Sequence, residues 1–337
     1  MPLPLALTQG DPAGIGPELA LLAWQRREAL DLPVFACIAD LDHLARLSRR
    51  LSLDVPLVAC DWEDVGRHFP AALPVIPLDE VSAIEPGRPD PATAPGTIAA
   101  ISRAVAAVRQ EKAGAVVTNP IAKSVLYAAG FAHPGHTEYL AHLAADGGMP
   151  PLPVMMLWCA ELAVVPVTIH VPLRAVPDLL TTELIVETGV IVARALKRSF
   201  GITAPRLALS GLNPHAGESG ALGHEDAAVV EPAVARLRAV GIDASGPYPA
   251  DTMFHARARA GYDAALAMYH DQALIPIKTI AFDEGVNVTL GLPFIRTSPD
   301  HGTAFDIAGQ GIARPDSLVA ALKLAARMVV QHEQTAP

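Results

Sequence analysis

Three histidines of this 337-residue chain each follow a short apolar run. His170 ends LAVVPVTIH, His215 follows LALSGLNP, and His270 follows AALAMY. Apolar runs of this length are typical of buried strands in an α/β protein. Ligands of open α/β sheets bind beyond the carboxyl ends of the strands, so three imidazoles there could hold one divalent metal ion. The alternative is three separate, hydrogen-bonded core histidines, because their spacing in sequence matches no metal motif.

A second group of polar residues suits a negatively charged ligand. In the sequence GHTE, His136 and Thr137 stand where a helix is expected to begin. The first turn of a helix offers unpaired N–H groups to a phosphate or carboxylate. The alternative is that Thr137 only caps the helix.

Three further polar residues lie in apolar surroundings. Lys278, Asn287 and Arg296 fall in segments that we expect to be strand-like. A cation in such a setting needs a partner, which can be a ligand. The alternative is internal ion pairing with nearby acids, namely Asp283, Glu284 and Asp300.

A glycine-rich segment follows, HGTAFDIAGQG, from His301 to Gly311. Its glycines permit close approach of the backbone to a ligand, and Asp306 offers a carboxylate. The pattern GxGxxG, which marks a dinucleotide-binding turn, is absent from the sequence. The N-terminal motif GDPAGIGPE (Gly10–Glu18) contains only part of that pattern and by itself is weak evidence for a nucleotide.

Composition limits the class of protein. The net charge of −10 and the lack of a basic patch argue against a nucleic-acid partner. Cys37, Cys60 and Cys159 are an odd number in unrelated contexts, which favours reduced thiols in a cytoplasmic protein. The N-terminus lacks a basic region, and no uncharged apolar run reaches about 18 residues, so we expect neither a signal peptide nor contact with a membrane.

Short apolar runs alternate with helical patterns along the chain, which predicts an α/β fold with a largely parallel sheet. Asp40 is expected to cap a helix that runs to about Leu51. Val154–Cys159 and Leu162–His170 are expected to pair as strands, and Leu173–Phe200 to form largely one long helix.

The segment HGTAFDIAGQGIARP is similar to the nucleotide loop of the isocitrate and isopropylmalate dehydrogenases, which wraps the adenosine of the cofactor. This chain has Phe305 where proline is usual and Arg314 where asparagine is usual. Asp306 matches the acid of members that use NAD. A carboxylate accepts from ribose hydroxyls and repels a 2′-phosphate, so NAD is favoured and NADP is the alternative.

Longer motifs cover the whole chain in order and resemble the 4-hydroxythreonine-4-phosphate dehydrogenase family. They are GDPAGIGPE, TNPIAK, GHTE, TIHVPL, GLNPHAGE, GPYPADTMF, AMYHDQ and GVNVTLGLPFIRTSPDHGTA. The resemblance implies two α/β/α domains of the isocitrate/isopropylmalate dehydrogenase-like type with a cleft between them. We expect a nucleotide-side domain at 1–130 plus 285–337, and a metal-site and dimerisation domain at 131–284. It also implies a homodimer with its active site near the subunit interface.

The resemblance also implies roles for individual residues. The metal ligands would be His170, His215 and His270, which favour zinc over the alternatives cobalt, magnesium and manganese. The substrate ligands would be His136, Thr137, Lys278, Asn287 and Arg296. The cofactor would contact His301, Gly302, Asp306 and Gly309. The candidates for the general base are Lys278, Asp251 and Asp271.

The activity implied is NAD-dependent, metal-dependent oxidation of 4-phosphooxy-L-threonine at the C3 hydroxyl. The resulting β-keto acid would decarboxylate to 3-amino-2-oxopropyl phosphate, in the biosynthesis of pyridoxal 5′-phosphate. The alternative within the enzyme class is a related dehydrogenase for threonate or erythronate 4-phosphate or a carboxylated dihydrodiol. A metal-dependent phosphometabolite sensor is a non-enzyme alternative. Asp283 and Glu284 replace a more glycine-rich, basic segment of some members and bear on substrate preference.

Overall fold

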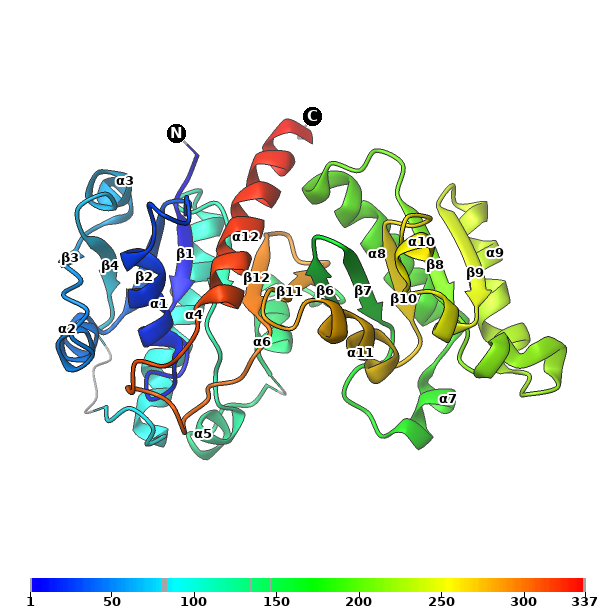
Figure 1. Ribbon diagram of the computed structural model, residues 1–337, viewed down its shortest axis with the longest axis horizontal. Coiled ribbons are helices and arrows are strands. Elements are labelled where there is room, and N and C mark those ends of the chain that lie inside the picture. Colours follow the sequence, from blue (N-terminus) through cyan, green and yellow to red (C-terminus); the bar gives the residue numbers. More distant parts are fainter. Residues whose placement is uncertain (1, 80–83, 134, 146, 336–337) are drawn as a thin grey trace. The chain divides into compact units, whose positions relative to one another are not determined.

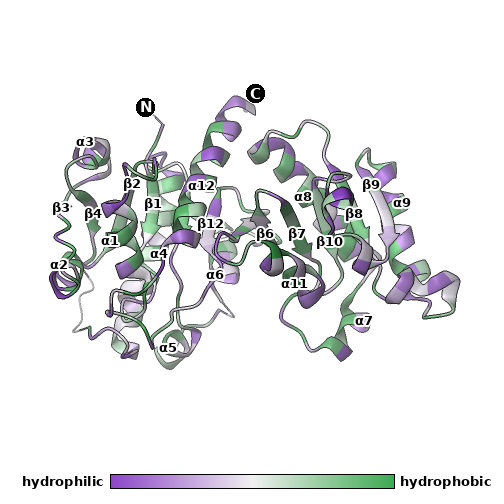
Figure 2. Ribbon diagram, viewed as in Figure 1, coloured by the Kyte–Doolittle hydropathy of each residue, from purple (hydrophilic) through white to green (hydrophobic). Residues whose placement is uncertain are grey.

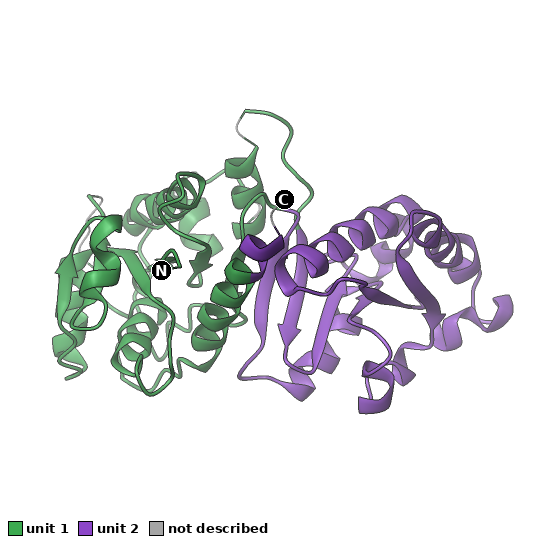
Figure 3. Cartoon of the chain, turned by 90° about the horizontal axis from the view of Figure 1, so that it is seen from above, with its two compact units in different colours: residues 1–153, 292–330 green, residues 154–291, 331–337 purple. Residues whose placement is uncertain are grey.

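The computed structural model describes residues 2–79, 84–133, 135–145 and 147–335. The chain divides into two compact units, and each combines two separate segments of sequence (Figure 3). Unit 1 comprises Met1–Pro153 and Leu292–Val330, and unit 2 comprises Val154–Gly291 and Gln331–Pro337. Each unit therefore needs a distant part of the chain to be complete.

Unit 1 is built on a sheet whose strands pair in parallel, in the order β3-β4-β2-β1-β5-β12. Thr8 of β1 lies opposite Ile38 of β2 and Thr118 of β5, so these strands end at one common edge. The strands are β1 (Leu5–Thr8), β2 (Phe35–Ala39), β3 (Leu57–Ala59), β4 (Leu73–Pro77), β5 (Val116–Thr118) and β12 (Arg296–Pro299).

Helices flank this sheet (Figure 1). Asp40 caps α2 as predicted, because its side chain accepts a hydrogen bond from the backbone N–H of His43 at 3.0 Å. The helices are α1 (Gly16–Gln25), α2 (Leu41–Arg50), α3 (Val65–His68), α4 (Ala94–Arg109), α5 (Lys123–Ala128), α6 (His136–Ala144) and α12 (Asp316–Thr335), with 3₁₀ turns at Trp62–Asp64 and Pro91–Thr93.

Helix α6 packs into the hydrophobic core of unit 1. Tyr139 and Leu140 of α6 are buried in the same aliphatic cluster as Ile38 and Ile101. The hydroxyl of Tyr139 also shares a hydrogen bond of 2.7 Å with Ser102 of α4. The sequence-based division at residue 130 would separate α6 from this core, whereas the compact unit extends to Pro153. The assignment of nucleotide binding to one domain and of metal binding and dimerisation to the other remains a prediction.

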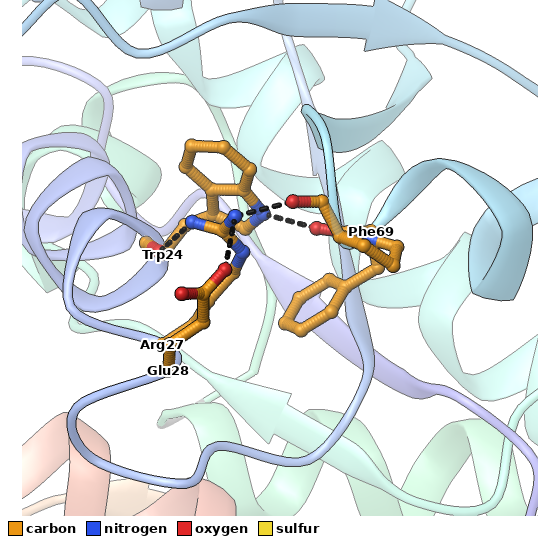
Figure 4. Close-up of polar contacts among 5 residues, drawn as sticks. Trp24, Arg27, Glu28 and Phe69 are labelled. Atoms are coloured by element: carbon orange, nitrogen blue, oxygen red, sulfur yellow. Dashed lines mark hydrogen bonds and ion pairs between the residues drawn. The ribbon is translucent and has the colours of Figure 1, made fainter.

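The C-terminal end of α1 is fastened to the segment before β4 (Figure 4). The indole Nε1 of Trp24 donates to the carbonyl of Phe69 at 3.0 Å. Arg27 stacks over the Trp24 ring, with its guanidinium carbon 3.9 Å from the ring centroid, and also donates to the carbonyl of Pro70. These contacts hold helix α1 at one end, and its other end carries the Gly10–Glu18 motif.

Unit 2 is built on a mixed sheet with the order β11-β6-β7-β10-β8-β9. Strand β6 runs antiparallel to both β11 and β7, as predicted for the β6–β7 pair, and the remaining neighbours are parallel. The strands are β6 (Val154–Cys159), β7 (Leu162–Pro166), β8 (Arg206–Ser210), β9 (Asp243–Tyr248), β10 (Ala264–Ala267) and β11 (Val286–Leu290).

The helices of unit 2 correct one prediction. Leu173–Phe200 is not one helix, because the hydroxyl of Thr181 accepts from Leu184 N–H and begins a new helix there. Figure 2 shows β7 in the green of hydrophobic residues, whereas α2 of unit 1 carries both colours. The helices are α7 (Val176–Leu179), α8 (Thr182–Phe200), α9 (Glu231–Ala239), α10 (Ala256–Arg259) and α11 (His270–Ile280), with a π-helix at Asp226–Val230 and 3₁₀ turns at Leu173–Ala175, Pro214–Gly220 and Ala250–Thr252.

Lys278 lies on helix α11, not on a strand-like segment as expected. Ala273, Leu274 and Ile277 form the buried face of this helix, which is helical spacing. Asn287 and Arg296 do lie on strands, β11 and β12. Among the residues that the structure describes, no helix is both long enough and apolar enough to cross a membrane.

Candidate functional site

The three predicted metal ligands follow three neighbouring strands of unit 2. Strand β10 pairs in parallel with β7 on one side and with β8 on the other. His170, His270 and His215 come after the carboxyl ends of β7, β10 and β8, respectively. The predicted placement of these histidines beyond strand ends is therefore observed.

Two of these histidines lie side by side. The ring centroids of His170 and His270 are 5.4 Å apart, and both rings line a pocket of about 320 Å³. Two imidazoles bound to one tetrahedral zinc ion would place their centroids roughly 5 Å apart, given zinc–nitrogen bonds of about 2 Å. The centroid separation of this pair therefore matches that of two imidazoles on one zinc ion.

The orientation of the His270 ring is set by its neighbour. Its Nδ1 atom lies 2.7 Å from Oδ1 of Asp271, a distance that fits an N–H donating to the carboxylate. A carboxylate partner on one ring nitrogen fixes the tautomer and leaves the other nitrogen to bind a metal. Asp271, predicted as a general-base candidate, is thus engaged with a predicted metal ligand.

His215 begins an unusual turn after β8. His215, Ala216, Gly217, Glu218 and Ser219 all have φ between 43° and 78°, the left-handed region. Residues other than glycine rarely adopt this conformation, and it is often found at functional sites. Within residues 2–79, 84–133, 135–145 and 147–335, no three His, Cys, Asp or Glu side chains gather closely enough to hold a metal ion. The structure therefore brings His170 and His270 together and does not gather His215 with them.

Asp226 supports the base of this turn. Its carboxylate is 1% exposed and accepts from the backbone N–H groups of Leu212 at 2.6 Å and Asn213 at 3.1 Å. Asp226 also begins a π-helix, a form that is rare and is often found at functional sites. Asp226 was not among the residues identified from the sequence.

The remaining predicted residues of unit 2 lie on three different elements. Lys278 is half-buried on α11, with its Nζ atom 5.8 Å from the centroid of the Phe282 ring. Asn287 is half-buried on β11, opposite Leu157 of β6. Asp251 is exposed in the 3₁₀ turn at Ala250–Thr252.

Arg296 is a buried cation on strand β12 of unit 1. It is 3% exposed, and its Nη2 and Nε atoms donate to the hydroxyl of Thr118 at 2.7 Å and 3.2 Å. Burial lowers the pKa of Arg296 to about 10, so the side chain remains positively charged at neutral pH. A buried cation held in this way can bind an anionic ligand strongly.

His136 and Thr137 open helix α6, as predicted. Burial and the positive charges of Arg296 and Lys123 hold the pKa of His136 well below its ordinary value. The Nε2 atom of His136 is buried and has no hydrogen-bond partner within the described part of the chain. The imidazole is therefore neutral near pH 7, with one ring nitrogen left over for a ligand.

Lys123 lies at the same end of α6 and was not singled out from the sequence. A Cβ atom added at Gly135, the N-cap of α6, would meet the Nζ atom of Lys123 at 3.0 Å. Lys123, Arg296 and the N-terminus of α6 bring positive charge to this region, where the carboxylate of Glu138 also lies, and such a set of groups suits a phosphate. The signal in the sequence was the lysine that ends TNPIAK.

The predicted nucleotide residues lie in the loop between β12 and α12. Asp306 and Gly302 are exposed, and no described atom lies within 4 Å of a Cβ built on Gly302. Gly309 has a φ of 72°, and the Nδ1 atom of His301 lies 3.0 Å from the carbonyl of Gly302. An exposed carboxylate beside open backbone fits a ribose with its hydroxyl donors.

The comparison with protein families gives a near-complete match. The model described as pyridoxal phosphate biosynthetic protein PdxA matches residues 33–325. The chain belongs to the PdxA family. A relative from Methylorubrum populi, named 4-hydroxythreonine-4-phosphate dehydrogenase, is 63% identical over 328 residues, or 96% of this chain and 94% of the relative. A PdxA relative of the same name from Caulobacter vibrioides is 51% identical, over 98% of both chains.

Solved structures agree with this family assignment. A 4-hydroxythreonine-4-phosphate dehydrogenase from Klebsiella pneumoniae is 37% identical with a TM-score of 0.86, and the match covers 98% of both chains. A terephthalate 1,2-cis-dihydrodiol dehydrogenase from Burkholderia xenovorans is 28% identical with a TM-score of 0.65, over 97% of this chain and 98% of that one. The predicted family resemblance and the α/β fold of this PdxA member are confirmed.

Proposed function

We propose that the protein is an NAD-dependent dehydrogenase that oxidises 4-phosphooxy-L-threonine, within the biosynthesis of pyridoxal 5′-phosphate. The observation that carries this proposal is the electropositive end of unit 1, where Arg296 and Lys123 act on His136 at the start of α6. That end suits the phosphate of the substrate named by the relatives, one of which is 63% identical to this chain.

Five residues are proposed as substrate ligands. His136, Thr137 and Arg296 belong to unit 1, and Lys278 and Asn287 belong to unit 2. We assign the phosphate to His136 and Thr137 and the remaining negative charge to Arg296 and Lys278. A neutral His136 can donate one hydrogen bond to a phosphate oxygen from a ring N–H.

We assign a divalent metal ion to His170 and His270, with His215 as the third ligand. The separation of the first two rings and the Asp271 partner of His270 support this assignment. Imidazole donors favour zinc, with cobalt, manganese and magnesium as alternatives. When bound, such an ion would act as a Lewis acid toward a substrate oxygen.

The proposed reaction proceeds in two steps. The C3–H bond breaks with its electron pair, which passes as hydride to NAD, while the C3 hydroxyl loses its proton to a base. The β-keto acid then loses its carboxylate as carbon dioxide, and C2 takes up a proton to give 3-amino-2-oxopropyl phosphate. Among the base candidates, Lys278 and Asp251 are favoured over Asp271, because Asp271 already pairs with His270.

The cofactor would lie against His301, Gly302, Asp306 and Gly309. The exposed carboxylate of Asp306 suits the ribose hydroxyls of NAD and disfavours the 2′-phosphate of NADP, which is the alternative. Replacing Asp306 with Asn should therefore narrow the preference for NAD over NADP. If the ratio of kcat/KM for NAD to kcat/KM for NADP is the same in the variant and the wild type, this role is contradicted.

We further propose a cytoplasmic homodimer with its active site near the subunit interface. Unit 2 exposes large apolar side chains on and beside α11, with Ile275 64% and Phe282 74% exposed. Exposed apolar groups of this size often mark an interface. Light scattering should give the mass of a dimer, and Phe282→Asp should shift it toward the monomer.

A second candidate activity is favoured by the likeness to the terephthalate dihydrodiol dehydrogenase. NADH formation should be followed with 4-phosphooxy-L-threonine, threonate 4-phosphate, erythronate 4-phosphate and a carboxylated dihydrodiol, with and without Zn²⁺ or Co²⁺. We expect the first substrate to have the highest kcat/KM. A higher value for another substrate would replace the proposed function, and full activity after chelation would remove the metal from it.

A further inference from the structure

The N-terminal motif Gly10–Glu18 has no role in the site described so far. Its last residue, Glu18, lies in the first turn of α1 and is 0% exposed. Its two carboxylate oxygens accept from the backbone N–H groups of Gly309 at 2.9 Å and of Ala313 at 3.3 Å. A buried carboxylate is costly unless it is hydrogen-bonded, so these contacts explain why an acid is tolerated there.

A second contact joins the same motif to the start of the same loop. The backbone N–H of Ile15 donates to the carbonyl of Thr303 at 2.9 Å. A Cβ atom added at Gly14 would lie 2.8 Å from that carbonyl oxygen, which is closer than real side chains approach. Glycine is therefore required at this position for the loop to lie against the motif.

The segment at Pro86 and Gly87 also packs against the loop at residues 303–313. The N–H of Gly87 donates to the carbonyl of Ala13 at 2.7 Å. Cβ atoms added at Gly87 and Gly309 would lie 2.9 Å from the Phe305 carbonyl and 2.7 Å from Pro86, respectively. Residues 303–313 are thus held by two segments that are distant in sequence.

We propose that Glu18 is a positioning residue for binding of the nicotinamide dinucleotide. It holds the backbone of 309–313 so that Asp306 and Gly309 present a preformed surface to the cofactor. The far end of α1 is fixed by the contacts of Trp24 and Arg27 in Figure 4, so Glu18 stands on an anchored helix. The inference rests on the proposed role of the loop at His301–Gly311.

Both oxygens of Glu18 are used, which determines the best substitution. In Glu18→Gln one oxygen becomes an NH₂ group, which faces an N–H donor and cannot accept from it. The loop loses one anchor while the size of the side chain is kept. Glu63→Gln is the matched control, because Glu63 is an exposed acid of unit 1 in the 3₁₀ turn at Trp62–Asp64.

The test uses NADH binding by fluorescence together with hydrogen exchange of peptides that cover residues 303–313. We expect Glu18→Gln to raise the Kd for NADH and the KM for NAD about tenfold, while kcat changes less than about threefold. The amides of Gly309 and Ala313 should exchange faster, and Glu63→Gln should match the wild type. Gly14→Ala, which removes no charge, should weaken NADH binding in the same direction and covers the case in which Glu18→Gln fails to fold.

The outcomes separate the inference from the function on which it rests. If the wild type does not bind NADH, the proposed cofactor role of the loop falls, and the inference falls with it. If the wild type binds NADH and both Glu18→Gln and Gly14→Ala bind it equally well, the inference alone is overturned. Equal exchange rates at 303–313 in Glu18→Gln and the wild type would also overturn it.

Discussion

Arg296 gives two of its guanidinium hydrogen bonds to a single oxygen, the hydroxyl of Thr118, at 2.7 Å and 3.2 Å. The two residues lie on the neighbouring parallel strands β12 and β5. A hydroxyl oxygen has two lone pairs, so it can accept both bonds. Thr118 therefore fixes the orientation of the buried guanidinium, which is the group proposed to contact the substrate.

Removal of that hydroxyl should disturb both stability and substrate binding. In Thr118→Val the shape is nearly kept, but buried N–H groups of Arg296 lose their acceptor. We expect a loss of about 2 kcal/mol in the free energy of unfolding, measured in urea, and a rise of about tenfold in the KM for the phosphorylated substrate. Thr118→Ser keeps the hydroxyl and should stay close to the wild type. An unchanged KM in Thr118→Val would contradict the positioning role.

The charge of Lys123 should affect the pKa of His136. Lys123 disfavours the protonated imidazole, so Lys123→Gln should raise the pKa of His136, as followed by NMR. The KM for the phosphorylated substrate should also rise, by about tenfold, because the phosphate loses a cation. Lys112→Gln removes an exposed lysine of the same unit and is the control. If the His136 pKa falls or stays constant, Lys123 does not act at this site.

His43 should make the stability of the protein depend on pH. Burial, the largest cause, lowers its pKa to about 4, against the opposing charge of Asp40 and with a smaller contribution from Arg46. Between about pH 6.5 and pH 4 the unfolded chain binds a proton that the folded chain does not bind. Stability from this group is therefore present above pH 6.5 and falls by about 3 kcal/mol as the pH drops to 4.

The variant His43→Gln should flatten this part of the pH profile. Urea unfolding at pH 7, 5.5 and 4.5 would measure the slope for the wild type and the variant. His142→Gln replaces an exposed histidine and should leave the slope as it is in the wild type. Identical slopes for all three proteins would show that His43 does not titrate differently in the two states.

Asp226 should support both the turn at His215 and metal affinity. In Asp226→Asn one of the two N–H groups, of Leu212 or Asn213, faces an NH₂ group in place of an oxygen. We expect a loss of about 2 kcal/mol in stability and about tenfold weaker binding of Co²⁺, measured by absorbance titration. Asp243→Asn changes an exposed acid of β9 and is the control. Unaltered Co²⁺ affinity would separate Asp226 from the proposed metal site.

Much of the fold was predictable because buried strands leave continuous apolar runs. The runs before His170, His215 and His270 gave β7, β8 and β10, and their parallel pairing follows from the helices between them. The run around Lys278 was misassigned, since a short apolar stretch that includes Pro276 fits a strand as well as a helix. Its burial at positions 273, 274 and 277 became visible only in the folded chain.

The supporting residues of the site were less accessible to sequence reasoning. Glu18 contacts Gly309 and Ala313, which lie 291 and 295 positions later in the sequence. A local sequence pattern does not predict contacts over such separations. The left-handed turn after His215 includes Ala216 and Ser219, residue types that do not predict positive φ. The three histidines, Lys278 and Arg296 could be identified because their residue types suit metal or anion binding, whereas Lys123 was missed.

The discontinuous composition of unit 1 has a consequence for its synthesis. Strand β5 pairs with β12, which leaves the ribosome only after the whole segment Val154–Gly291. A nascent chain that stops before Arg296 therefore presents an unpaired strand edge at β5, while the larger segment of unit 2 is already complete. An unpaired strand edge of this kind can pair with another chain and aggregate, or it can be bound by a chaperone. Unit 1 would therefore remain prone to misassembly until β12, the last strand to be synthesised, pairs with β5.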